Sequence, residues 1–185
     1  AMGITIHKNK VLHKLPFLFS NSNNLSFEAL NSKKNIILVP GASDDSKRYP
    51  AKKFAKLTEL IDANFLIIWG SSEEKFIAEK IYNSSKNTTV CNETSLDDLI
   101  SIISKSNLVI GPDTGPTHIA WALNIPSITI FGPTPGYRNT LTTKINRIIE
   151  SESEVNPLKI NKNDFSIKDI DVNEIVTLSR KLLKQ

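Results

Sequence analysis

Short apolar segments alternate along this chain with segments whose apolar residues recur every three or four positions, from about residue 35 onward. The short segments are almost continuously apolar, which is typical of strands buried on both faces of a parallel sheet. Turns containing glycine, proline or serine follow most of them. The pattern predicts strands at 35–40, 65–69, 88–91, 107–110 and 127–131, with a sixth at 147–149.

The segments between these strands carry one apolar side, which predicts helices. We expect Pro50 at the first helical position, Ser71 or Ser72 as the N-cap of a second helix, and Ser95 as the N-cap of a third. A short helix at 117–123 and a final helix at 172–183 complete the pattern. Strands that alternate with helices predict an α/β fold, a Rossmann-like doubly wound parallel sheet.

Residues 1–34 do not fit this alternation. The apolar stretch 15–19 is followed by the Ser- and Asn-rich stretch 20–26. We interpret 1–34 as a connecting arm or interdomain segment, and 35–185 as the Rossmann-like domain. An edge strand with a linker is the alternative interpretation of 1–34.

Composition narrows the function classes. A length of 185 residues suits one domain, and the net charge of +4 comes from scattered basic residues, which gives little support for nucleic-acid binding. The single cysteine, Cys91, is expected to be a small core residue. Three histidines and one cysteine do not support a metal site, so we expect none. We also expect neither a signal peptide nor a membrane helix.

The segment 111–123 carries the strongest chemical signal. It turns from an apolar strand through Asp113, Thr114 and Gly115 into an apolar helical run that contains His118. A helix N-terminus has unsatisfied N–H donors and a partial positive charge, so it suits a phosphate. In a parallel α/β sheet this end also lies at the carboxyl edge, where ligands bind.

Three other loops follow expected strands. The loop 40–50 offers Ser43 and Lys47, whose hydroxyl and ammonium suit a diphosphate. The segment 69–74 offers Glu74, and a carboxylate after the second strand commonly accepts from ribose hydroxyls. The loop 131–139 contains two glycines and two prolines, so it has a defined shape. Each has a plainer interpretation. The loop 40–50 could be an ordinary solvated loop, the acidic residues after residue 70 could simply favour the helix dipole, and the loop 131–139 could be a rigid turn.

Two other function classes are disfavoured. Asp-Thr-Gly is also the active-site tripeptide of aspartic proteases, but those are all-β proteins with two copies, and this chain has one copy in an α/β pattern. Neither a Gly-x-Gly-x-x-Gly motif nor a P-loop is present, which argues against NAD enzymes and P-loop ATPases.

Taken together, these motifs resemble the C-terminal half of glycosyltransferase family 9, the ADP-heptose:lipopolysaccharide heptosyltransferases. The resemblance rests on Pro-Gly-Ala at 40–42, Lys-Arg-Tyr-Pro at 47–50, Gly70 with Glu74, and above all the run 113–123 with 130–134. Within the family, Asp-Thr-Gly and the loop 132–137 are more similar to heptosyltransferase I than to heptosyltransferase II. Pro116-Thr117 departs from the Leu-Ser or Leu-Met that is more usual there, which leaves the contact with the second phosphate open.

The resemblance implies a GT-B architecture in which this half, residues 35–185, binds the nucleotide-sugar donor. It implies that Lys47 contacts the diphosphate with help from Ser43, that Glu74 faces the adenosine ribose, and that Thr114 and Gly115 lie at the phosphates. Asp113 and His118 would lie near the phosphates or the heptose. No cofactor is implied.

The family's N-terminal acceptor domain has no counterpart in this chain's pattern. The catalytic base belongs to that domain, so no catalytic residue is assigned here, and the chain alone is expected to be inactive. The acceptor would be a 3-deoxy-octulosonate (Kdo) sugar of Kdo-lipid A, whose hydroxyl attacks C1 of the heptose with inversion as ADP leaves. The resemblance places this reaction at the cytoplasmic face of the inner membrane, with peripheral membrane association. Another GT-B enzyme (heptosyltransferase II or a nucleotide-sugar epimerase) and a non-catalytic nucleotide-binding domain are the alternatives.

Overall fold

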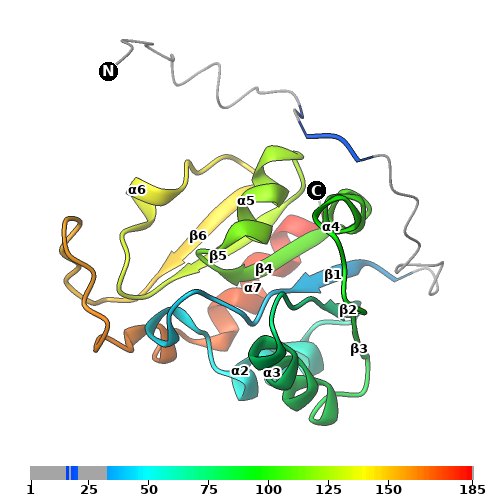
Figure 1. Cartoon of the computed structure of the whole chain (residues 1–185), viewed down its shortest axis with the longest axis horizontal. Coiled ribbons are helices and arrows are strands. Elements are labelled where there is room, and N and C mark those ends of the chain that lie inside the picture. Colours follow the sequence, from blue (N-terminus) through cyan, green and yellow to red (C-terminus); the bar gives the residue numbers. More distant parts are fainter. Residues whose placement is uncertain (1–15, 17, 21–32, 185) are drawn as a thin grey trace.

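A six-stranded parallel sheet forms the centre of the computed structural model, which describes residues 16, 18–20 and 33–184 (Figure 1). The strands lie in the order β3-β2-β1-β4-β5-β6, and every pairing is parallel. Their bounds are β1 Asn35–Leu38, β2 Asn64–Ile67, β3 Thr88–Val90, β4 Leu108–Pro112, β5 Ser127–Phe131 and β6 Asn146–Glu150. This is the strand order of a Rossmann-like doubly wound sheet, so the expected fold class is confirmed.

Helices cover both faces of the sheet. One core cluster joins the strands to α2 (Ala51–Leu60), α3 (Ser72–Asn83) and α7 (Val172–Leu183), and a second joins the opposite face to α4 (Leu96–Ser104) and α5 (Gly115–Ala122). The remaining helical elements are short: η1 Asp45–Lys47, α6 Gly136–Asn139 and η2 Ser166–Lys168.

Alternate residues of one strand feed the two cores. In β1, Ile36 and Leu38 belong to the cluster with α2, whereas Ile37 belongs to the cluster with α4 and α5. All three side chains are completely buried, which is why residues 36–38 are all apolar. Burying each such side chain stabilises the fold by roughly 1.5–3 kcal/mol.

The expected helix starts are mostly confirmed. Ser71 caps α3 by accepting from the Glu74 backbone, and Ser95 forms a capping box with Asp98 at the start of α4. The expectation for Pro50 is wrong by one position. Its φ of −62° suits a helix, but its ψ of 134° is extended, so Pro50 is the N-cap of α2 and the helix begins at the next residue.

The topological switch point lies between β1 and β4. From β1 the chain continues through β2 and β3 toward one edge, whereas β4, β5 and β6 extend toward the other. Gly111 lies at this seam, and a Cβ there would be 2.6 Å from the Cβ of Val39 and 2.9 Å from its carbonyl oxygen. The two strands approach this closely only because residue 111 has no side chain.

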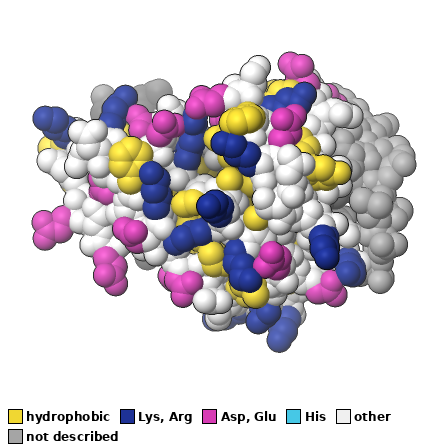
Figure 2. All heavy atoms as spheres, turned by 90° about the horizontal axis from the view of Figure 1, so that it is seen from below, with side chains coloured by type: hydrophobic (Ala, Val, Ile, Leu, Met, Phe, Trp, Pro, Cys, Tyr) yellow, Lys and Arg dark blue, Asp and Glu magenta, His cyan; other side chains and the backbone are white. Residues whose placement is uncertain are grey.

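Most of residues 1–34 lie outside the described part of the chain, so the interpretation of this segment and the division at residue 34 stay predictions. Of the described ones, Leu18 packs against the second core cluster, Phe19 is 83% exposed, and the Ser20 hydroxyl donates to the Asp97 carbonyl. In the part of the chain that is described, no helix combines the length and apolar character needed to cross a membrane. Figure 2 shows basic and acidic side chains interspersed over one face of the molecule, with small apolar areas between them.

Candidate functional site

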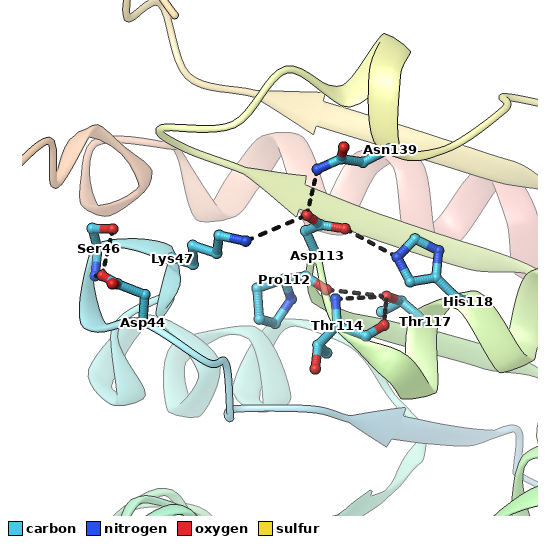
Figure 3. Close-up of polar contacts among 9 residues, drawn as sticks. All are labelled: Asp44, Ser46, Lys47, Pro112, Asp113, Thr114, Thr117, His118 and Asn139. Atoms are coloured by element: carbon cyan, nitrogen blue, oxygen red, sulfur yellow. Dashed lines mark hydrogen bonds and ion pairs between the residues drawn. The ribbon is translucent and has the colours of Figure 1, made fainter. Parts of the chain in front are cut away.

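Asp113 is the centre of a polar cluster at the carboxyl edge of the sheet (Figure 3). It follows the last residue of β4, and only 9% of its side chain is exposed. The Nε2 of His118 lies 3.0 Å from its Oδ1, the Asn139 amide donates to its Oδ2 at 2.7 Å, and the Nζ of Lys47 is 3.6 Å from that same Oδ2. Three loops, after β1, β4 and β5, therefore meet at one carboxylate.

These partners determine the charge of Asp113. Burial by itself would raise the pKa of the carboxyl group. Hydrogen bonds from His118 and Asn139, with the positive charge of Lys47, outweigh that effect and hold the pKa of Asp113 below its ordinary value. Asp113 is therefore a carboxylate at neutral pH, available as a counter-ion and a hydrogen-bond acceptor.

Helix α5 begins directly after Asp113. Thr114 is its N-cap in extended conformation, and the Thr117 hydroxyl lies 2.7 Å from the Thr114 carbonyl oxygen. Gly115 is the first helical residue and is exposed; apart from its chain neighbours and the backbone of its own helix, no described atom lies within 4 Å of where a Cβ would be. The first turn of α5 thus presents its positive end on an open side, which suits an anion.

The turn η1 delivers Lys47 to this cluster. Asp44 is the N-cap of η1, and its Oδ1 accepts from the Ser46 backbone at 3.1 Å and from the Ser46 hydroxyl at 2.8 Å. The Nζ of Lys162 lies 3.2 Å from the other Asp44 oxygen. Ser43, which the sequence places in the same site, is exposed and takes no part in the cluster among the described residues.

Glu74 lies on the other side of the switch point, at a cavity of about 260 Å³. Its Oε2 accepts from the Gly70 backbone at 2.7 Å. A Cβ on Gly41 would overlap the Glu74 carboxylate, so the glycine makes room for it. Thr114 also lines the cavity, which connects it to the start of α5. The other lining residues are Val39, Gly41, Ile68, Trp69, Gly70, Thr94, Ser95, Leu96, Leu99 and Pro116.

An ion pair connects the loop that carries Lys47 to the helix that carries Glu74. The guanidinium of Arg48, next to Lys47, binds both carboxylate oxygens of Glu73 at 2.6 and 3.2 Å. This bidentate pair joins the η1 loop to the first turn of α3, where Glu74 lies, and the hydrogen bond from Arg48 lowers the pKa of Glu73. The structure thus brings Lys47, Asp113, Thr114, Gly115 and His118 together and places Glu74 at the adjoining cavity.

The sequence does not single out two groups of residues at this site. Asn139 lies in the loop 131–139, which the sequence does indicate, but an amide in a loop has no distinctive pattern. Thr94, Leu96 and Leu99 line the cavity, although their sequence pattern is that of a helix start and an apolar helix face. Within the described part of the chain, no group of three His, Cys, Asp or Glu side chains is arranged to hold a metal ion.

Comparison with known proteins finds one family repeatedly. Residues 12–165 match the family model of glycosyltransferase family 9 (heptosyltransferase). Lipopolysaccharide heptosyltransferase 1 of Campylobacter coli is 40% identical over 161 residues, which are 82% of this chain and 47% of that protein. Lipooligosaccharide heptosyltransferase 2 of Haemophilus influenzae is 32% identical over 149 residues, covering 74% of this chain and 42% of that protein.

Solved structures support the fold. The Escherichia coli heptosyltransferase WaaC with ADP superposes with a TM-score of 0.69 at 18% identity, over 83% of this chain and 45% of that one. A family 9 glycosyl transferase from Veillonella parvula gives a TM-score of 0.72 at 17% identity, over 86% and 48%. The chain therefore spans less than half the length of each of these relatives.

Proposed function

This chain belongs to glycosyltransferase family 9, and we propose that it binds the ADP-heptose donor of an inverting heptosyltransferase at the switch point between β1 and β4. One observation carries the proposal. The start of α5, the Lys47 ammonium and the Asp113 carboxylate meet beside the cavity that Glu74 lines. The positive end of α5 with the Lys47 ammonium suits the diphosphate, and the cavity lined by the Glu74 carboxylate suits the nucleoside.

In this proposal the diphosphate lies against the first turn of α5, with Lys47 beside it. Backbone N–H groups and an ammonium are the donors that a diphosphate requires. Glu74 accepts from the ribose hydroxyls, as a carboxylate after the second strand of a dinucleotide-binding fold does. The apolar part of the cavity, around Leu96 and Leu99, receives the base.

The reaction would proceed by attack of an acceptor hydroxyl on C1 of the heptose, with inversion, as ADP leaves. Lys47 and the α5 N-terminus would offset the negative charge that develops on the leaving diphosphate. The base that deprotonates the acceptor is assigned to an N-terminal acceptor domain, so this chain alone would bind donor without transferring it. The proposed acceptor is a Kdo sugar of Kdo-lipid A, and the proposed place of action is the cytoplasmic face of the bacterial inner membrane.

Calorimetric titration of the chain with ADP, ADP-heptose, UDP and NAD tests the proposal. We expect binding of ADP and ADP-heptose in preference to UDP and NAD. A preference for UDP would assign the domain to another kind of GT-B enzyme, such as a nucleotide-sugar epimerase. If nothing binds, repeating the titration on a protein that contains both domains separates a shared site from a wrong assignment.

Two substitutions with matched controls locate the site. Lys47→Ala and Glu74→Ala should each weaken ADP binding by about tenfold or more, because each removes a hydrogen bond that involves a charged group. Lys56→Ala and Glu79→Ala change exposed residues of the same kinds on α2 and α3 and should leave the affinity unchanged. Unchanged affinity in both site variants would reject the site.

A further inference from the structure

Asn139 is the neutral member of the cluster around Asp113. Its amide Nδ2 donates to the Asp113 Oδ2 at 2.7 Å, the shortest of that carboxylate's three side-chain contacts. The opposite oxygen, Oδ1, faces the His118 ring at 3.0 Å. Figure 3 shows Asn139 approaching from the side opposite to Thr114, with Lys47 on a third side.

The backbone around Asn139 is anchored to the far edge of the sheet. Helix α6, which ends at Asn139, begins at Gly136, and the Gly136 backbone donates to the Glu150 carboxylate on β6 at 2.8 Å. A Cβ at position 136 would lie 2.8 Å from the Cδ1 of Ile148, so α6 packs closely against β6. The Asn139 amide therefore reaches Asp113 from a fixed backbone.

The other two partners of Asp113 hold its carboxylate less firmly. His118 has 44% of its side chain exposed. The Lys47 side chain is only 14% exposed, but its ammonium lies 3.6 Å from the carboxylate, which is longer than a hydrogen bond. A carboxylate held only by these two groups could rotate about its χ2 angle, which has a broad energy profile. A short hydrogen bond from an anchored amide restricts that rotation and adds no charge beside the cation.

We propose that Asn139 is a positioning residue that fixes the plane of the Asp113 carboxylate, so that Oδ1 faces His118 and Oδ2 faces Lys47. Asp113 in turn sets the place of the Lys47 ammonium. The first step rests on the contacts above. The consequence for ligand binding, that Lys47 is set for the donor's diphosphate, rests on the proposed function.

The test follows the Asp113 carboxyl signal by NMR across pH in the 185-residue chain, beside calorimetry with ADP. Among the described residues, the charged or titratable groups in contact with Asp113 are Lys47 from η1 and His118 from α5. Asn139→Ala should raise the pKa of Asp113, because one of the donors that holds it low is lost. Asn139→Asp should raise it further, since it places a like charge at the same distance.

The ADP dissociation constant should increase about threefold to tenfold in Asn139→Ala and more in Asn139→Asp. The matched control is Tyr137→Ala, which changes a residue of α6 that is 75% exposed and should alter neither measurement.

Each outcome decides one step. If both Asn139 variants keep their fold and the Asp113 titration is that of the wild type, Asn139 does not position the carboxylate. If the titration shifts but ADP affinity does not, Asp113 does not set Lys47 for the diphosphate. If the wild type binds no ADP, the proposed function fails, and the titration of Asp113 still decides the role of Asn139.

Discussion

At Gly115 a side chain would not disturb the fold, but it would occupy the place that we propose for the ligand. Apart from its chain neighbours and its own helix backbone, no described atom lies within 4 Å of a Cβ built on it, and none of the described glycines has a positive φ. The fold therefore accepts alanine at position 115 without strain. Replacing glycine by alanine at a compatible position stabilises a protein by about 0.4–1 kcal/mol, chiefly by restricting the unfolded chain. For a chain of this size, that gain raises the melting temperature by about 1–4 °C.

The effect of Gly115→Ala on the ligand should have the opposite sign. The added methyl group occupies the open side of the first turn of α5, where we place the diphosphate. If it displaces the phosphate from one backbone N–H, the loss is that of a hydrogen bond to a charged group, about 1.5–3 kcal/mol. This corresponds to an ADP dissociation constant about tenfold to 150-fold higher.

Two measurements on one variant check this reasoning. Thermal unfolding without ligand should show an unchanged or higher melting temperature, and titration with ADP should show the weakened binding. Wild-type affinity in Gly115→Ala would mean that the diphosphate does not lie against this turn. A lower melting temperature without ligand would mean that the glycine serves the fold, and the argument from open space would be wrong.

Three further predictions concern the same edge of the sheet. Gly111→Ala should lower the free energy of unfolding by about 1–3 kcal/mol, measured by denaturant titration, because its methyl group would lie 2.6 Å from the Cβ of Val39. The lowered pKa of Asp113 contributes stability that is full above its unfolded-state pKa and is lost as pH falls through the folded-state pKa. Below about pH 4 the wild type should therefore lose stability more steeply than Asp113→Asn, a difference that denaturant titrations across pH would detect. Ser46→Ala removes a buried hydroxyl that donates at 2.8 Å within η1, and should cost about 0.5–1.5 kcal/mol in thermal unfolding and weaken ADP binding through Lys47.

The sheet could be predicted from the sequence because its central strands are buried on both faces and carry apolar residues in succession, as in Ile36, Ile37 and Leu38. The expected strand 127–131 has the bounds of β5, and the expected helix 172–183 has those of α7. The end of β4 was less predictable. Pro112 extends this strand, although proline cannot donate to a sheet, because pairing with β1 ends at Ile110 and only β5 continues beside it.

The site was predictable only where a residue's position in the sequence determines its surroundings. Asp113, Thr114 and Gly115 belong to a strand-to-helix turn, so their place at the carboxyl edge follows from the fold. The contact between Asn139 and Asp113 spans 26 residues and depends on how α6 packs against β6. No local pattern encodes that packing. The exposed position of Ser43 likewise follows from the path of its loop and from no property of serine.

The arrangement of charge gives Asp113 a role in the proposed site. The first turn of α5 and the Lys47 ammonium place partial and full positive charge at one point of the sheet edge, and His118 adds another charge whenever it is protonated. Repulsion among these groups would oppose their assembly without an anion among them. Asp113 supplies that anion, with its Oδ2 toward Lys47 and its Oδ1 toward His118. Its carboxylate also lies at the N-terminus of α5, where a negative charge is favourable. In the proposed donor complex, the diphosphate would therefore meet an ammonium that Asp113 already holds in place, so the free energy of bringing these charges together is contributed by folding and not by ligand binding.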